Sequence, residues 1–428
     1  MILLIFFGVF FFTLFISIPV FLSLALSALS LLSNKGMLVP QLVVQRMFAG
    51  MDSFPLMALP FFMLAGALMD TGGISTRLVR FSNYLVGWIQ GGLAHVAILA
   101  SVFFAGITGS AVADASAIGS TLIPLMKKRG FPTLFSASVV AAAGVVGPII
   151  PPSIPMVIYG VMANVSIGAL FMGGFIPGIL IGLGLMAVVY VKAKRHGYPR
   201  ETVHPTIRDF WQATVSAMGA IVMPLIILGG IFGGVFTATE AAVVATIYAF
   251  IMGKFVYKEL EWGHIPQILY KGGLSTAMVL IIVGVANLVG YIMAVERIPM
   301  MVADLLLSMT TNPLILMLLI NILLLIVGCF IDGAAALIIF TPVLLPLIYK
   351  MGIDPIYFGV VMCVNLMIGT ITPPVGVCLF VVCGIADVRL DQISKAVIPF
   401  MLVEIAVLLL ITYVPDLIMF VPHMFAPK

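Results

Sequence analysis

Gly106-Ile-Thr-Gly-Ser-Ala-Val-Ala-Asp114 is a run of small and polar residues inside a chain that is otherwise apolar. A second such run, Gly147-Pro-Ile-Ile-Pro-Pro-Ser153, follows it. Adding 222 to these positions carries Gly106 to Gly328 and Gly147 to Gly369. Other helix breakers recur at the same offset: Pro124 with Pro346, Gly130 with Gly352, Pro151-Pro152 with Pro373-Pro374, and Pro177 with Pro399. The sequence therefore predicts a gapless internal repeat with four broken places.

The composition around these breaks is that of a membrane protein. Of the 428 residues 63% are hydrophobic and 8% are charged, against about 25% charged in a soluble domain. Apolar runs of about 20 residues, the length that crosses a bilayer, follow one another with short joins. We therefore predict an all-α polytopic protein of a bacterial inner membrane. The continuous spans are expected at 1–32, 54–70, 169–193, 209–234, 237–253, 272–295 and 397–420.

The remaining long segments are interrupted. Segments 93–128 and 313–349 break at their centres, and each arm is too short to cross about 30 Å comfortably, which predicts two re-entrant helical hairpins. Segments 132–165 and 356–386 are long enough to cross, but each carries a Pro-Pro pair, which removes two amide donors and predicts an unwound helix. Such backbone is tolerated at membrane depth only where it is buried in protein or lines a cavity.

Basic residues set the predicted orientation. Lys127-Lys128-Arg129 and the run from Lys192 to Arg200 must share a side, which the positive-inside rule makes cytoplasmic. Counting crossings from there places the N-terminus in the cytoplasm and the C-terminus in the periplasm. An odd number of crossings separates the hairpins, so the repeats are predicted to be inverted. The net charge of +4 reports this orientation and not nucleic-acid binding.

Five units follow from this count. They are an N-terminal span with scaffold and interfacial arm helices (1–92), two transport-domain halves (93–168 and 313–390), connecting scaffold helices (169–312) and a C-terminal scaffold helix (391–428). The polar joins 34–53 and 255–271 are predicted to be helices along the membrane interface.

Paired broken helices in inverted repeats are the sequence sign of a transporter binding site, where freed carbonyls suit Na⁺ and half-helix N-termini suit an anion. The predicted Na⁺ ligands are Gly106, Thr108, Ser110, Gly147 and Pro148 in the first copy and Gly328, Asp332, Gly369, Thr370 and Thr372 in the second. The predicted substrate ligands are Asp114, Ser153 and Arg297. The carboxylate shifts from the 114 column to the 110 column between copies, so we expect two unequal sites with the organic acid between them.

Structural alternatives stand beside these assignments. Ser110 could be only a helix N-cap and Asp114 a first-turn acid favoured by the helix dipole. Arg297 could be a residue that snorkels to the interface, and His95 a packing residue. Asn287, Asn321 and Asn365 fit interhelical hydrogen bonds as well as ligands. No Gly-x-Ser-x-Gly, His-Glu-x-x-His or P-loop pattern occurs, so the protein is not expected to be an enzyme.

Four stretches resemble the large membrane subunit of tripartite ATP-independent periplasmic (TRAP) transporters, with the sialic acid type favoured. They are 115–131, 144–160, 234–242 and 369–376. The resemblance implies an elevator-type carrier that moves its site across the membrane with Na⁺. It maps Thr108, Ser110, Asp114 and Asp332 onto the ion and substrate region. Glu240 lies in one of the resembling stretches, and we expect it to make a scaffold hydrogen bond.

The resemblance also implies partners. These are a small four-helix membrane subunit, expected as a separate chain, and a soluble periplasmic substrate-binding protein. The implied substrate is an organic acid, with sialic acid favoured over a C4-dicarboxylate. The alternative function is a free-standing Na⁺-coupled carboxylate or ion antiporter that needs no binding protein.

Overall fold

The computed structural model describes residues 2–16, 18–34, 39–200, 206–310 and 312–425, and every regular element in these residues is a helix. Seven helical segments are long and apolar enough to cross a membrane: Phe54–Thr71, Ile167–His196, Arg208–Phe232, Ala238–Val256, Trp262–Val295, Gly333–Lys350 and Leu390–Tyr413. Five of them match predicted spans, and Leu390–Tyr413 overlaps the predicted span 397–420 but begins and ends earlier. The seventh, Gly333–Lys350, was expected to be a hairpin arm too short to cross comfortably.

The first copy of the repeat runs through eleven helices. They are α1 (Ile2–Phe15), α2 (Val20–Asn34), α3 (Pro40–Met51), the 3₁₀ turn η1 (Phe54–Met57), α4 (Ala58–Thr71), α5 (Ile74–Val86), α6 (Gly92–Thr108), α7 (Ala111–Lys128), α8 (Thr133–Val145), α9 (Ile154–Ala163) and α10 (Ile167–His196).

The second copy follows a similar order, but one long helix stands where the first copy has α3, η1 and α4, and a further helix follows at the end. Its elements are α11 (Ile207–Phe232), α12 (Ala238–Ile251), the π-helix η2 (Met252–Val256), the 3₁₀ turn η3 (Trp262–His264), α13 (Ile265–Val295), α14 (Ile298–Met309), α15 (Pro313–Gly328), α16 (Gly333–Lys350), α17 (Pro355–Gly369), α18 (Val377–Ala386), α19 (Leu390–Tyr413) and α20 (Asp416–Phe425). Adding 222 to both ends of α7 gives both ends of α16, so the repeat is kept in structure as well as in sequence.

The four predicted breaks are present. Gly109 and Ser110 separate α6 from α7, and residues 329–332 separate α15 from α16. Residues 146–153 interrupt α8–α9 and residues 370–376 interrupt α17–α18, each around a cis Pro-Pro bond. Prolines end these helices because they lack the amide donor and clash with the preceding turn.

Two predicted continuous spans are wrong. The span 1–32 is two helices, α1 and α2, because Pro19 disfavours helical backbone at the residue before it. The span 397–420 ends at Tyr413, and Pro415 separates it from α20. In both cases a single proline inside an apolar run outweighs the continuity of the hydrophobic pattern.

Segment 255–271, predicted to be a helix along the interface, is not one separate helix, because α13 begins at Ile265 and runs unbroken to Val295. Its counterpart in the first copy is divided into α3, η1 and α4. Pro55 lies at the start of η1, and the matching position in the second copy is Ala277. The first copy therefore breaks where the second continues as one long helix.

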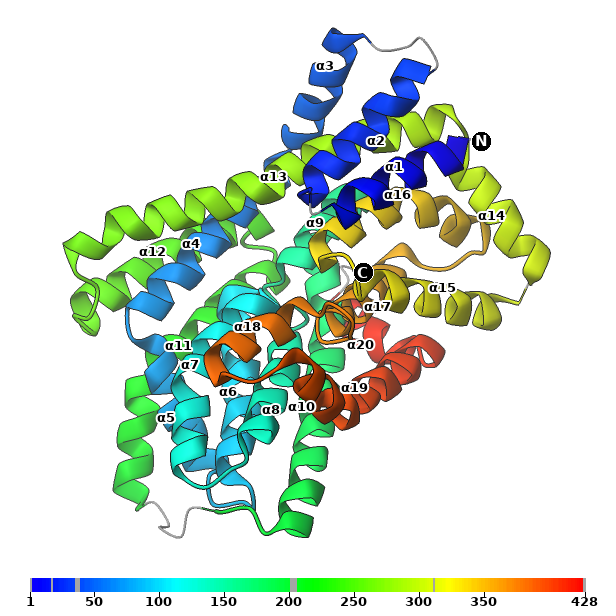
Figure 1. The fold of residues 1–428 in the computed structure, drawn as a ribbon. Helices are drawn as coiled ribbons and strands as arrows, with labels where there is room; N and C mark the ends of the chain where they lie inside the picture. The colour runs from blue at the N-terminus through cyan, green and yellow to red at the C-terminus, as the bar shows by residue number, and fades with distance from the viewer. Residues whose placement is uncertain (1, 17, 35–38, 201–205, 311, 426–428) are drawn as a thin grey trace.

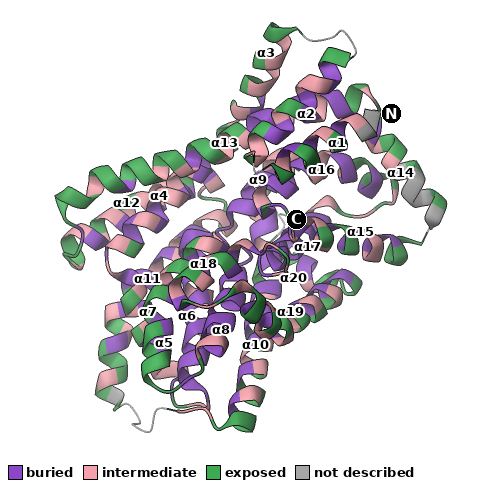
Figure 2. Cartoon of the chain, in the orientation of Figure 1, coloured by how far each residue is buried: buried purple, intermediate pink, exposed green. Residues whose placement is uncertain are grey.

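Helices of each copy pack against helices of the other copy (Figure 1). Helix α7 packs against α18 of the other copy, and α9 packs against α16 in the same way. Around them α4 packs against α12, and α3 lies along α13. Figure 2 shows buried residues concentrated in α6, α8, α9 and α17, whereas the outer faces of α11 and α13 are exposed. The broken helices therefore lie at the centre of the molecule.

Candidate functional site

The α6–α7 tip lies against the break between α8 and α9. Asp114, in the first turn of α7, is fully buried, and Thr108 at the end of α6 donates a hydrogen bond to its Oδ1. The other carboxyl oxygen, Oδ2, has no hydrogen-bond partner among the described residues. A Cβ placed on Gly147 would lie 2.1 Å from this oxygen, so only glycine leaves room for the carboxyl group at the break.

Two serines hold the helix starts at this break. Ser110 is the N-cap of α7, and its Oγ accepts a hydrogen bond from Ala113 N at 3.5 Å. Ser153 is the N-cap of α9, where its Oγ accepts from Met156 N at 3.2 Å and donates to Pro148 O. The N-cap alternative for Ser110 is therefore what the structure shows. An N-cap hydroxyl retains a lone pair, so this geometry does not exclude a ligand role.

The α15–α16 tip lies against the second break in the corresponding way. Gly328 and Gly369 are in close contact, because a Cβ on Gly369 would lie 2.6 Å from Gly328 Cα. The backbone of the unwound stretch also bonds to the tip, with Val375 N donating to Cys329 O at 3.3 Å. Sequence reasoning correctly paired each tip with the break of its own copy.

The polar groups of this second tip are arranged differently. Asp332 is the N-cap of α16, where its Oδ2 accepts from Ala334 N at 3.0 Å, and its side chain is exposed. Thr370 donates its hydroxyl to Met367 O at 2.6 Å, and Thr372 donates to Ile368 O at 2.8 Å. The buried, half-satisfied Asp114 and the exposed capping Asp332 make the two tips chemically unequal.

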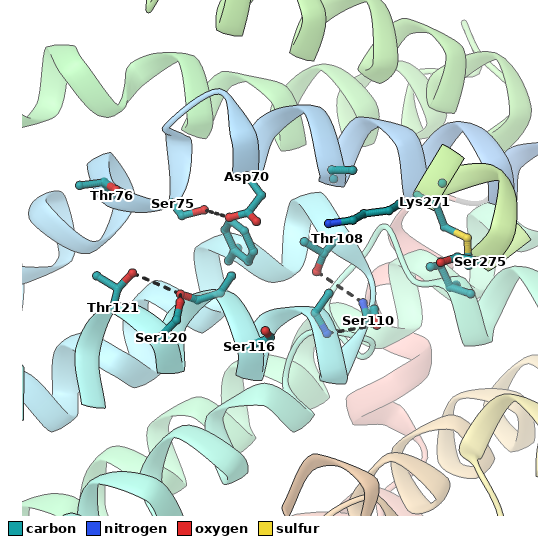
Figure 3. A pocket seen from close by; sticks show the side chains of 18 residues that line it. Asp70, Ser75, Thr76, Thr108, Ser110, Ser116, Ser120, Thr121, Lys271 and Ser275 are labelled. Carbon is teal, nitrogen blue, oxygen red and sulfur yellow. Dashed lines mark hydrogen bonds between the residues drawn. The ribbon is translucent and has the colours of Figure 1, made fainter. Parts of the chain in front are cut away.

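A cavity of about 490 Å³ opens beside the first tip, between α4 and α13 on one side and α6 and α7 on the other (Figure 3). Thr108 and Ser110 line it at the tip. Its other polar lining residues are Asp70, Ser75, Thr76, Ser116, Ser120, Thr121, Lys271 and Ser275. In Figure 3 Lys271 extends into the cavity from α13. The lining thus offers hydroxyl groups, one ammonium group and one carboxylate, which suit a small polar ligand.

Sequence reasoning missed these lining residues. Ser116 and Ser120 lie four apart on α7, so they share the face that looks into the cavity. That spacing of hydroxyls within an apolar chain was the available signal. Lys271 carried no such signal, because its approach to the first tip depends on how α13 packs.

The three predicted substrate residues do not line this cavity. Asp114 and Ser153 are buried behind the tip, facing the α8–α9 break. Arg297 is exposed at the junction of α13 and α14, with φ of 55°. The structure thus brings Asp114 and Ser153 to the predicted ion region, and it leaves Arg297 apart from both.

The asparagines form contacts between helices. Asn365 Nδ2 donates to Asn321 Oδ1 at 2.8 Å, and Asn321 Nδ2 donates to Thr412 Oγ1 at 3.0 Å, which joins α17, α15 and α19. Asn287 of α13 packs against Gly50 of α3. Of the two interpretations, interhelical hydrogen bonding is the one that Asn321 and Asn365 display.

The structure also shows the surroundings of Glu240 and His95. Glu240 forms a capping box at the start of α12, accepting from Thr237 N at 2.8 Å and Thr237 Oγ1 at 2.9 Å. The expected hydrogen bond of Glu240 is therefore present, and it stabilises a helix start. His95 is buried in α6, and neither ring nitrogen has a hydrogen-bond partner in the described part of the chain.

The Asp114 region presents oxygen atoms at the break between α8 and α9. The described residues contain no cluster of three or more His, Cys, Asp or Glu side chains that could hold a transition metal. A buried carboxylate oxygen without a partner, beside backbone released from helical bonding, is instead a hard oxygen donor set. Oxygen donors of this kind are chemically compatible with the Na⁺ site that the sequence predicts.

Two repeat copies whose helices pack against each other, paired helix breaks and a polar cavity beside the first tip define a multi-pass membrane transport protein. Comparison with known proteins agrees. Residues 7–417 match the family model described as "Tripartite ATP-independent periplasmic transporter, DctM component". The chain belongs to this family, which confirms the resemblance drawn from the sequence. It is a transporter permease of a bacterial membrane and not an enzyme.

Two relatives and one solved structure illustrate the likeness. The chain is 45% identical over 97% of its length to the isethionate TRAP transporter permease protein DctMQ of Oleidesulfovibrio alaskensis, and spans 65% of that protein. It is 41% identical over 96% of its length to the sialic acid TRAP transporter permease protein SiaT of Haemophilus influenzae, and spans 67% of that protein. The YdaH transporter of Alcanivorax borkumensis has a similar fold, with TM-score 0.65, 15% identity, and coverage of 92% of this chain and 97% of that chain.

Proposed function

We propose that the chain is the large membrane subunit of a Na⁺-driven importer of an organic acid. The observation that carries the proposal is the buried Asp114 oxygen without a partner at the first tip, next to a polar cavity that shares Thr108 with it. An ion at Asp114 and a substrate in the cavity would then contact the same short tip. Binding of each would stabilise the same arrangement of the α6–α7 pair, which is the basis of coupling.

The proposed movement is an elevator. In this scheme α6–α9 and α15–α18, within segments 93–168 and 313–390, form the mobile unit as two re-entrant hairpins and two broken helices. The scaffold comprises 1–92, 169–312 and 391–428. Helix α7 packs against α18, and α9 packs against α16. This packing supports movement of the two transport-domain halves as one body. The cavity supports it too, because scaffold helices line one side and tip helices the other.

An anionic substrate is favoured by Lys271. Its ammonium group is the one cation among the described residues that line the cavity, which it shares with several hydroxyl groups and the Asp70 carboxylate. The relatives described above are named for isethionate, a sulfonate, and sialic acid, a carboxylate. A single acidic group is common to both. Sialic acid remains the favoured substrate and a C4-dicarboxylate the second choice.

The proposed partners follow the tripartite family description. They are a small four-helix membrane subunit on a separate chain and a periplasmic binding protein that delivers the substrate. The proposed topology places the N-terminus in the cytoplasm and the C-terminus in the periplasm, because Lys127, Lys128 and the basic end of α10 then face inward.

Reconstitution tests the proposal. The chain and its small subunit are placed in proteoliposomes with an inward Na⁺ gradient, and uptake of labelled sialic acid, succinate and isethionate is measured with and without the binding protein. Uptake of one compound should require both Na⁺ and the binding protein, and an inward K⁺ gradient of equal size should not replace Na⁺. Uptake at full rate without the binding protein would instead establish the free-standing Na⁺-coupled carrier.

A further inference from the structure

The cavity beside the first tip holds a carboxylate that the proposed function does not use. Asp70 is the next-to-last residue of α4, and Figure 3 shows its side chain extending from that helix into the cavity. Its Oδ1 accepts a hydrogen bond from Ser75 Oγ of α5 at 2.7 Å. The ion pairs found among the described residues include neither Asp70 nor Lys271. The cavity therefore presents one negative and one positive group that are not paired with each other.

The position of Asp70 does not favour the helix that carries it. Helix α4 ends at Thr71, so the carboxylate lies in the last turn, where the helix dipole favours a cation instead. The next basic residue along the chain, Arg77, binds elsewhere, with Nη2 at 2.6 Å from Glu259 Oε1 and Nη1 donating to Gly73 O at 2.7 Å. The second carboxyl oxygen of Asp70, Oδ2, has no hydrogen-bond partner in the described part of the chain and is available to a ligand.

Several hydroxyl groups of the lining already donate their protons within the protein. Ser75 donates to Asp70, and on α7 Ser120 and Thr121 donate to Ala117 O at 3.0 and 3.3 Å. A hydroxyl group whose proton is used in this way can still accept hydrogen bonds through its oxygen. Together with Asp70, these acceptors come from α4, α5 and α7. They are therefore spread over the cavity wall and not gathered at one point.

These groups determine what a ligand must offer. The Lys271 ammonium group only donates hydrogen bonds, and it can hold one acidic group. The spread acceptors need donors at several places along the ligand, which hydroxyl groups on successive carbon atoms provide. An ammonium group on the ligand would instead bring all its donors to one point. A second carboxylate on the ligand only accepts hydrogen bonds, and the charge of Asp70 would repel it.

We propose that Asp70 determines the specificity of the cavity, which takes an acid with one acidic group and several hydroxyl groups. Lys271 binds the acidic group, and Asp70 accepts a hydrogen bond from a ligand hydroxyl group through Oδ2. The same carboxylate repels a second acidic group, so the cavity rejects a diacid. This inference rests on the proposed function in that it takes the cavity as the substrate site, but it does not depend on Na⁺ coupling.

A series of acids with the same carbon chain length tests the selectivity. Gluconate carries hydroxyl groups, hexanoate carries none, adipate carries a second carboxylate and ε-aminocaproate carries an ammonium group. Binding of labelled gluconate to the purified full chain is measured in Na⁺ buffer, with each unlabelled acid as competitor. Gluconate should compete at a concentration at least about tenfold lower than the others, because one hydrogen bond to a charged group contributes that factor. Stronger competition by any of the other three acids would overturn the proposal.

Substitutions of Asp70 separate its charge from its shape. Asp70→Asn keeps the size and removes the charge, so gluconate should bind about tenfold more weakly and adipate about tenfold more tightly. Asp70→Glu keeps the charge and should still reject adipate. The matched control is Asp304→Asn, because Asp304 is exposed on the surface and pairs with Lys350 at 3.3 Å. Equal discrimination against adipate in the wild type and in Asp70→Asn would overturn the proposal.

A variant on α7 keeps the proposal testable if the Asp70 variants fold poorly. Thr121→Val keeps the shape of the side chain and removes one acceptor from the lining. It should weaken gluconate binding by about 2- to 12-fold and leave competition by hexanoate unchanged. Equal losses for the two acids would show that the hydroxyl groups of the lining do not select the ligand.

Repeating the binding measurement in K⁺ buffer distinguishes failure of this inference from failure of the proposed function. Selective gluconate binding that is equally tight in Na⁺ and K⁺ would count against Na⁺ coupling and leave the role of Asp70 standing. Binding that requires Na⁺ but does not discriminate among the acids would overturn the role of Asp70 and leave the proposed function standing. Absence of binding of all the acids would show that the cavity is not the substrate site, which overturns the inference.

Discussion

Asp114 and Gly147 lie so close together that any side chain at position 147 would displace the Asp114 carboxyl group. This contact joins the α6–α7 tip to the α8–α9 break. The site depends on it, because the carboxyl oxygen that faces Gly147 is the one without a hydrogen-bond partner.

Gly147→Ala should abolish Na⁺-dependent uptake, because the new methyl group would lie 2.1 Å from Asp114 Oδ2 and must move it. The measurement is initial uptake at saturating substrate over a range of Na⁺ concentrations. Gly229→Ala is the control, since a Cβ there meets nothing within 4 Å. Wild-type Na⁺ dependence in Gly147→Ala would separate Asp114 from the ion site.

Thr108→Val should weaken Na⁺ dependence, because valine keeps the shape of threonine but cannot donate to Asp114 Oδ1. Removing one hydrogen bond to a buried charged group costs about 1–3 kcal/mol, so the half-saturating Na⁺ concentration should rise by about 5- to 150-fold. Thr108→Ser retains the hydroxyl and should behave like the wild type. Equal effects of valine and serine would show that packing, and not the hydrogen bond, is what matters.

Asp332→Ala should abolish Na⁺-dependent transport and leave membrane insertion intact. The carboxylate caps α16 and lies exposed at the second tip, so its loss removes charge without opening the core. Asp304→Ala provides the comparison, because Asp304 pairs with Lys350 on the surface at 3.3 Å. Exposed pairs contribute little, so this variant should transport normally. Unchanged Na⁺ dependence in Asp332→Ala would remove Asp332 from the ion site.

Lys271→Gln should raise the substrate KM without changing the Na⁺ dependence, because it removes the positive charge from the cavity and leaves the tip untouched. A charge-assisted hydrogen bond contributes about 1.5–3 kcal/mol, which corresponds to a KM increase of about 10- to 150-fold. Lys395→Gln, an exposed lysine in α19, is the matched control. An unchanged KM would show that the anion binds elsewhere.

Thr237→Ala should lower stability and leave transport intact. It removes the capping box that Thr237 and Glu240 form at the start of α12. Loss of an N-cap costs about 1 kcal/mol, which a small fall in melting temperature of the detergent-purified protein would report. Loss of transport with unchanged melting temperature would give this motif a functional role instead.

The broken places could be predicted from the sequence because they rest on local chemistry. A Pro-Pro pair interrupts a helix, as Pro151-Pro152 and Pro373-Pro374 do here. The offset of 222 showed which breaks correspond. The errors also have local causes. Pro19 divides a run that hydrophobicity alone made continuous, and Ala277 in place of Pro55 lets α13 continue through a position where the first copy breaks.

The cavity could not be predicted, because it depends on tertiary packing. Lys271 and Ser110 are far apart in sequence, and they line one space only because α13 and α7 face each other across it.

The packing of α7 against α18 also sets the order in which the protein can assemble. A ribosome delivers α7 to the membrane long before α18 exists, and domains synthesised first generally begin folding first. The face of α7 that packs against α18 therefore lacks its final neighbour until nearly the whole chain has been made. Contacts between distant segments also form slowly. Biogenesis of this protein consequently includes a late step in which the two halves close on each other, and truncation before α18 leaves the first half without its partner.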